Sequence, residues 1–89
     1  MLFITLANDK TKMTKEIIAQ NLKFMEQESK EDGVKVVGVY WTLGHYDGVF
    51  ILDSPNEKAV MKWVMRRAEW MKMDTLVAIP AEEAREFVM

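Results

Sequence analysis

The sequence predicts an α+β fold of the ferredoxin-like type, with the element order strand, helix, strand, strand, helix, strand (βαββαβ) and a short helix at the end. Three observations predict it. Four short segments are rich in apolar residues, and two longer segments between them repeat their apolar residues at helical spacing. A glycine-bounded turn joins the second and third short segments. We therefore expect one domain over residues 1–89, with a four-stranded antiparallel sheet and two helices on one face of it.

The composition narrows the kinds of chemistry that one chain can perform. Of 89 residues, 49% are hydrophobic and 29% are charged, which is typical of a globular domain. The chain contains no cysteine and one histidine. This excludes disulfides, thiolate catalysis and cysteine-ligated metals, as well as a site made of several histidines within one chain. We predict no metal site, no cofactor and no complete set of catalytic residues.

The charge pattern argues against two classes of partner. The net charge is −2 and both signs are mixed along the chain, whereas a nucleic-acid-binding protein would carry a basic patch. The first residues lack the basic start and the long apolar stretch of a signal peptide, and no apolar run is long enough to cross a membrane. We expect a cytoplasmic protein that binds neither nucleic acid nor membrane.

The first strand and helix are expected in the first third of the chain. Leu2–Ala7 is a short apolar run and predicts a buried strand. Thr11 or Thr14 can cap a following helix, in which apolar residues recur at helical spacing from Met13 onward. The helix is expected to end at Gly33, since glycine tolerates a positive φ.

An antiparallel hairpin is expected in the middle of the chain. Val34–Leu43 is rich in β-branched and aromatic residues and predicts its first strand. Residues 44–48 form the turn, and Val49–Leu52 is the returning strand. Gly44 is expected to have a positive φ or a close backbone neighbour.

The last third of the chain predicts a helix, a strand and a short tail helix. Ser54 is expected to cap the helix, with Pro55 at its first position and Glu57 completing a capping box. Lys72–Ile79 is expected to be the last strand, and Pro80 opens the tail helix.

Apolar residues on both faces of the predicted sheet favour a dimer. Two helices cover one face, and the other would be polar if it met water. Instead, the first three strands are apolar on both faces. Such a patch usually marks an interface, so we expect a homodimer in which two sheets pack face to face through the open face. The alternative is that the tail, with Phe87 and Val88, folds over the second face, but so few residues cannot cover four strands.

The stretch Tyr40-Trp41-Thr42-Leu43-Gly44-His45-Tyr46-Asp47 resembles the signature of the GYD domain family, Tyr-x-Thr-x-Gly-x-Tyr-Asp. The similarity continues into Asp53-Ser54-Pro55 and extends more loosely over most of the chain. It implies a ferredoxin-like fold of the dimeric α/β-barrel type, and it implies no established reaction. One departure is Glu69-Trp70, where the family often has Gly-Asn.

Five residues of this hairpin are the candidate ligand-binding residues: Tyr40, Thr42, His45, Tyr46 and Asp47. Histidine side chains often act as general bases, and His45 lies in the turn with Tyr46 and Asp47, which suits that role. The alternative, a solvent-exposed turn residue, is favoured, because His45 occupies a variable position of the family pattern. Asp47 and Tyr46 can anchor a ligand, or they can serve the turn itself, and we favour the structural role. The hydroxyl groups of Tyr40 and Thr42 can meet a ligand or a backbone carbonyl.

Two further groups of residues have a functional and a structural interpretation. The methionines 61, 65, 71 and 73, with Trp63 and Trp70, can line an apolar pocket or fill the core, and core packing is favoured. Arg66 and Arg67 can bind an anion or form salt bridges on a solvated helix face, which is the usual role of such pairs.

Two functional hypotheses follow. The first is a small homodimeric domain that binds a small, largely apolar ligand or a protein partner without catalysis. The second is a small cofactor-independent enzyme, similar to ferredoxin-like monooxygenases, with an apolar pocket between the sheet and the helices. The second rests on fold analogy alone.

Overall fold

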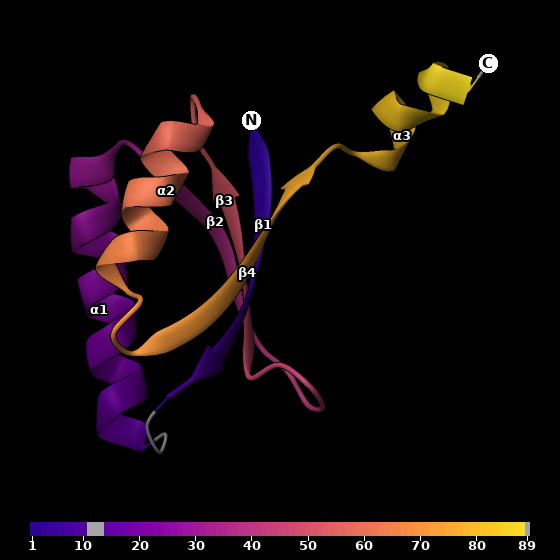
Figure 1. Cartoon of the computed structure of the whole chain (residues 1–89). Coiled ribbons are helices and arrows are strands. Elements are labelled where there is room, and N and C mark those ends of the chain that lie inside the picture. Colours follow the sequence, from indigo (N-terminus) through magenta and orange to yellow (C-terminus); the bar gives the residue numbers. More distant parts are fainter. Residues whose placement is uncertain (11–13, 89) are drawn as a thin grey trace.

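The computed structural model describes residues 1–10 and 14–88, with the backbone alone at residues 21 and 24–31. It contains a four-stranded antiparallel sheet in the order β2-β3-β1-β4 (Figure 1). The elements are β1 (Leu2–Asp9), α1 (Lys15–Asp32), β2 (Lys35–Trp41), β3 (Gly48–Asp53), α2 (Glu57–Arg66), β4 (Met71–Ala78), α3 (Ala81–Ala84) and the 3₁₀ turn η1 (Arg85–Val88). The predicted α+β fold is confirmed, and the strand bounds differ from the expected ones by one or two residues.

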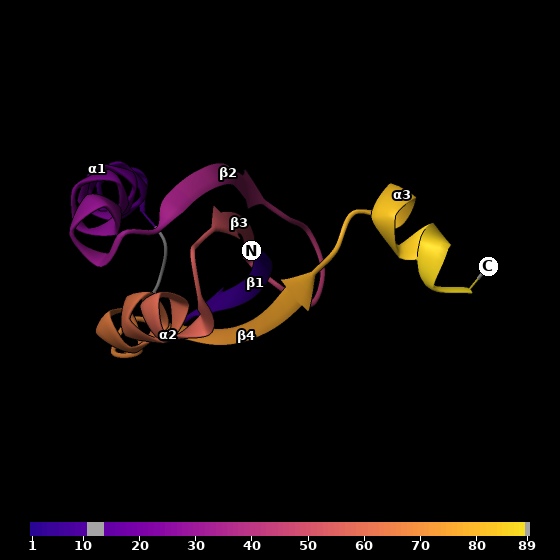
Figure 2. The ribbon, with the colours of Figure 1, turned by 90° about the horizontal axis from the view of Figure 1, so that it is seen from above.

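The core lies between the sheet and the two long helices. Seen from above, α1 and α2 lie on the same side of the sheet (Figure 2). Phe50, Leu52 and Trp63 are fully buried there, and the edge of the Phe50 ring meets the Trp63 ring at 5.6 Å between centroids. Among the side chains that the structure describes, the other buried apolar residues are Phe3, Ala7, Val34, Val60 and Met71.

The opposite side of the sheet carries what we call the open face. On β1, Phe3, Thr5 and Ala7 are buried, so Leu2, Ile4 and Leu6 point the other way. The strand register places further apolar side chains beside them. The open face comprises Leu2, Ile4, Leu6, Tyr40, Val49, Ile51 and Leu76.

The ends of α1 agree with the sequence prediction where the structure describes them. Thr14 caps the helix, because its Oγ1 accepts a hydrogen bond from the Ile17 amide at 3.2 Å. Gly33 follows the last helical residue with a φ of 76°. The other capping candidate, Thr11, lies outside the described residues, as does Met13.

The predicted start of α2 was wrong. The cap is Asn56, whose side chain accepts from the Ala59 amide at 2.9 Å, and the helix begins at Glu57. Ser54 is buried, its amide donates to the Met1 carbonyl, and its hydroxyl donates to the Asn56 carbonyl. Ser54 is thus bonded to Met1 beside the start of β1, and α2 begins three residues later.

Beyond β4 the chain leaves the body of the domain. The C-terminal arm, defined as residues 79–88, extends away from the sheet and carries α3 and η1 (Figure 1). Neither α3 nor η1 contains a buried residue. The arm therefore does not fold over the open face of its own chain.

Candidate functional site

Hydrogen bonds within the segment that joins β2 to β3 hold its two ends together. The Thr42 amide donates to the Asp47 carbonyl at 3.0 Å, and Thr42 Oγ1 donates to the Tyr46 carbonyl at 2.5 Å. Gly44 has a φ of 109°, as the sequence predicts for this turn. The Thr42 hydroxyl thus meets a backbone carbonyl, the structural alternative for this side chain.

Asp47 fastens this segment to β1. Its amide donates to the Ala7 carbonyl at 2.9 Å and to Asn8 Oδ1 at 3.0 Å. Its carboxylate accepts from the Asp9 amide at 2.9 Å. The side chain therefore accepts a backbone hydrogen bond, as its structural interpretation expects, but the donor belongs to β1 rather than to the turn.

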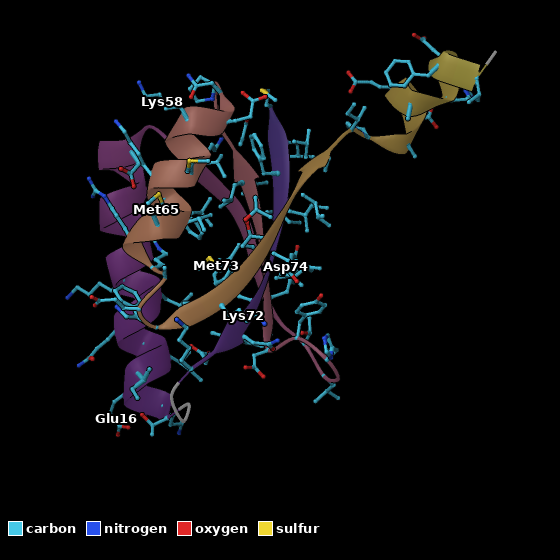
Figure 3. The ribbon with its side chains drawn as sticks, viewed as in Figure 1. Glu16, Lys58, Met65, Lys72, Met73 and Asp74 are labelled. Atoms are coloured by element: carbon cyan, nitrogen blue, oxygen red, sulfur yellow. The ribbon has the colours of Figure 1, made fainter. Side chains whose placement is uncertain are left out.

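Tyr46 reaches across the sheet to β4. Its hydroxyl donates to Asp74 Oδ2 at 3.1 Å. Asp74 is the β4 partner of Leu6 and lies on the open-face side, while Met73 points toward the helices (Figure 3). The His45 ring meets the Tyr46 ring edge-on at 4.8 Å between centroids. The tyrosine ring thus bridges the loop and the far edge strand.

Tyr40 lies apart from the other four candidates. It is on β2 at the open face, and its ring covers Gly38, where a Cβ atom would come within 3.0 Å of the ring. The register shifts between Val36 and Gly38, a β-bulge that the sequence pattern does not predict. The structure therefore brings Thr42, His45, Tyr46 and Asp47 together, with Tyr40 on the neighbouring strand.

Two ionisable groups in this region have shifted pKa values. Burial raises the pKa of Asp9 above its ordinary value, and the nearby Asp47 carboxylate raises it further. The hydrogen bond to Asp74 raises the pKa of Tyr46, with smaller contributions from burial and from the charge of Asp74. Both shifts favour the protonated forms, so Tyr46 is a hydrogen-bond donor at neutral pH.

An apolar cavity lies on the other side of the sheet, between α2 and strands β1 and β4. Its volume is about 280 Å³. Its lining residues are Phe3, Glu57, Val60, Met61, Val64, Thr75 and Val77. Thr75 Oγ1 is 3.1 Å from the Oγ1 of the buried Thr5, so these two hydroxyl groups share a hydrogen bond. None of the five hairpin candidates lines this cavity.

A second cavity, of about 670 Å³, lies between the end of α1 and α2 and is lined mainly by polar and charged residues. Lys58, Lys62 and Arg66 recur along α2 at intervals of four residues and border it. Arg66 forms an ion pair of 3.4 Å with the buried carboxylate of Asp32 at the end of α1. Lys58 and Met65, which also border this cavity, are labelled on α2 in Figure 3.

The tryptophan and methionine cluster divides between core and surface. Met71 and Trp63 are buried, and Met73 and Trp70 pack against the core, as the structural interpretation predicts. Met61 and Met65 are instead mostly exposed and border different cavities.

The prediction that Arg67 lies on a solvated helix face is wrong. Arg67 is fully buried, its guanidinium lies 4.0 Å from the Trp63 ring centroid, and Nη1 donates to the Trp63 carbonyl at 2.8 Å. The two charged neighbours, Arg66 and Arg67, look alike in sequence. They differ because α2 ends between them, and the turn directs Arg67 inward.

The described residues contain no group of three or more histidine, cysteine, aspartate or glutamate side chains placed to hold a metal ion. Within the same part of the chain, no helix has the length and apolar character needed to cross a membrane.

The family model of the GYD domain matches residues 1–88. No curated protein matches the sequence. The match includes the hairpin that carries the family pattern and extends from the first strand through the C-terminal arm. This chain therefore belongs to the GYD domain family.

Proposed function

We propose that this protein acts as a homodimer through its open face and binds a small, largely apolar ligand in the cavity between α2 and β4. The proposed dimer rests on one observation, the uncovered apolar surface of the sheet. Leu76 and Tyr40 are 52% and 58% exposed at its two edges, and the half-buried Ile4 and Ile51 lie between them. Contiguous apolar surface of this kind favours a protein interface.

A second copy of the same chain is the partner that this surface fits. A two-fold axis brings the same patch of each subunit together, so apolar residues meet apolar residues without a second complementary surface. Two sheets packed face to face lie about 10 Å apart, which leaves room for the side chains of both open faces to interdigitate.

The mainly apolar lining of the cavity supports the proposal that it binds an apolar ligand. Its lining is mainly aliphatic and aromatic. The polar residues in the lining are Glu57 and Thr75, and the Thr75 hydroxyl is paired with the hydroxyl of Thr5. A volume of about 280 Å³ suits a compact molecule. If the protein is instead an enzyme, the same cavity would hold the substrate. Catalysis would then be revealed by a change in the mass of a retained compound during incubation.

The hairpin residues lie outside the proposed ligand cavity. Tyr40 and Tyr46 border the open face, so they would contact a ligand only if it lay between the two sheets. Loss of binding in Tyr40→Phe or Tyr46→Phe would move the proposed ligand site from the cavity to the interface.

The dimer is tested with one substitution on the open face and one on α2. Leu76 and Met65 are both exposed, at 52% and 69%, but lie on opposite sides of the sheet. We expect the native chain to sediment with twice the mass of one chain at micromolar concentration. Leu76→Lys should give a monomer and Met65→Lys should remain a dimer. A native chain that sediments as a monomer contradicts the proposal.

The cavity is tested with the fluorescent apolar probe 1-aminoanthracene and by native mass spectrometry. Val64→Phe narrows the cavity, whereas Met65→Phe changes the neighbouring exposed residue outside it. We expect the probe to bind the native chain and Met65→Phe equally, and Val64→Phe at least about tenfold more weakly. Equal binding by all three proteins rules out this cavity as the ligand site.

A further inference from the structure

The C-terminal arm exposes apolar side chains far from the core of its own chain. Ile79, Phe87 and Val88 are 52%, 70% and 87% exposed. These residues stand along a segment that projects from the end of β4 (Figure 1). Their exposure has an energetic cost in water that a partner surface would remove.

The arm is too short to hold its shape alone. α3 has four residues and η1 has four, whereas isolated helices of fewer than about 12 residues are marginal in water. Pro80 supplies no side-chain capping bond to α3. Contacts beyond those within the arm would stabilise its helical conformation.

The arm projects on the side of the sheet that the open face occupies. In the view from above, α1 and α2 lie on one side and α3 lies on the other (Figure 2). A groove of about 580 Å³ at the base of the arm is lined by Met1, Leu2, Val77, Ile79, Pro80 and others. Because Leu2 also belongs to the open face, the surface at the base of the arm is continuous with the proposed dimer interface.

We propose that the C-terminal arm of each protomer packs against the second copy of this chain, which buries Phe87 and Val88. This inference rests on the proposed dimer. The occupant is a second copy because the arm and the open face point to the same side, so a subunit that covers one also reaches the other. The arm then extends the interface beyond the area of the two sheets.

The contact is tested by photocrosslinking in the full-length chain. We replace Phe87 with p-benzoylphenylalanine and, as a control, make the same replacement at the exposed Met65 on α2. After irradiation, we expect covalent dimers from position 87 and none from position 65. A sample that sediments as a dimer but does not crosslink from position 87 overturns the arm contact and leaves the proposed dimer intact. A sample that sediments as a monomer overturns both.

A pair of double variants gives an independent measurement. Phe87→Ser with Val88→Ser removes the two most exposed apolar side chains of the arm, and Leu22→Ser with Met65→Ser removes exposed apolar side chains on α1 and α2. We expect the first pair to raise the dimer dissociation constant at least about tenfold and the second to leave it unchanged. An equal dissociation constant in both double variants overturns the inference, and so does a dimer dissociation constant in the arm variant that matches the native one.

Discussion

The Tyr46 hydroxyl donates a 3.1 Å hydrogen bond to Asp74, and this bond joins the β2–β3 connection to the opposite edge strand. The connection therefore has attachments to two strands, since Asp47 also binds the backbone of β1. Tyr46 and Asp47, the tyrosine and aspartate of the family pattern, hold the loop against one end of the sheet through these hydrogen bonds. The loop consequently borders the open face at a fixed position.

The Tyr46–Asp74 bond predicts a shift in tyrosine ionisation. The pKa of Tyr46 lies above its ordinary value of 10.0, mainly because the hydrogen bond to Asp74 favours the protonated phenol. The bond therefore stabilises the fold fully below about pH 10, and this stabilisation is lost as the pH rises through the raised pKa. We expect Asp74→Ala to lower the pKa of Tyr46, measured by ultraviolet titration in a Tyr40→Phe background that leaves one tyrosine.

Asp53→Ala is the control for this titration. Asp53 is also an exposed acidic residue, but it lies at the other end of the sheet, paired with Leu2 and Lys35. Its replacement should leave the Tyr46 titration where it was. A titration that is identical in all three proteins would show that Asp74 does not set the ionisation of Tyr46.

The neighbouring carboxylates Asp9 and Asp47 predict a second pH effect. The pKa of Asp9 is raised above 3.8, first by burial and then by the charge of Asp47. Because the folded chain holds this proton more tightly than the unfolded chain, the contribution of Asp9 to stability is fully present below pH 3.8. It is lost as the pH rises through the raised pKa.

Asp47→Asn separates the two causes. The amide oxygen can still accept from the Asp9 backbone, but the negative charge is gone. We expect the pKa of Asp9, followed by the NMR shift of its carboxyl carbon, to fall part of the way toward its ordinary value, because burial remains. Glu57→Gln removes a charge at a distant helix start and should not change it. No fall in Asp47→Asn would rule out the electrostatic contribution.

The sequence predicted local structure well wherever neighbouring residues determine it. Thr14 caps α1 and Gly33 ends it, and both effects depend on bonds or angles within a few residues. The prediction of where α2 starts is wrong because a residue distant in the chain takes part. Ser54 has the right chemistry for a cap, but its amide is already bound to Met1, more than fifty residues away in the chain.

The sequence predicts which hairpin residues form the candidate site, but it does not predict which residues they contact. The hairpin residues were identified, but their partners Asp9 and Asp74 come from β1 and β4, and only the strand register brings them within reach. The cavity beside α2 is equally non-local, since Phe3, Val64 and Thr75 come from three elements. No spacing pattern in the sequence records such contacts.

Arg67 gives the clearest prediction about stability. It is fully buried, stacks on Trp63 and donates to the Trp63 carbonyl. We expect Arg67→Gln to lower the free energy of unfolding by about 2 kcal/mol or more, because both the stacking and a buried charged hydrogen bond are lost. The exposed Lys62 on α2 provides the comparison, and Lys62→Gln should change the free energy of unfolding by no more than about 0.5 kcal/mol. Urea unfolding at one fixed protein concentration measures both, since a dimer makes stability depend on concentration. If the two variants unfold at the same urea concentration, the buried position of Arg67 contributes no more to the fold than a surface charge does.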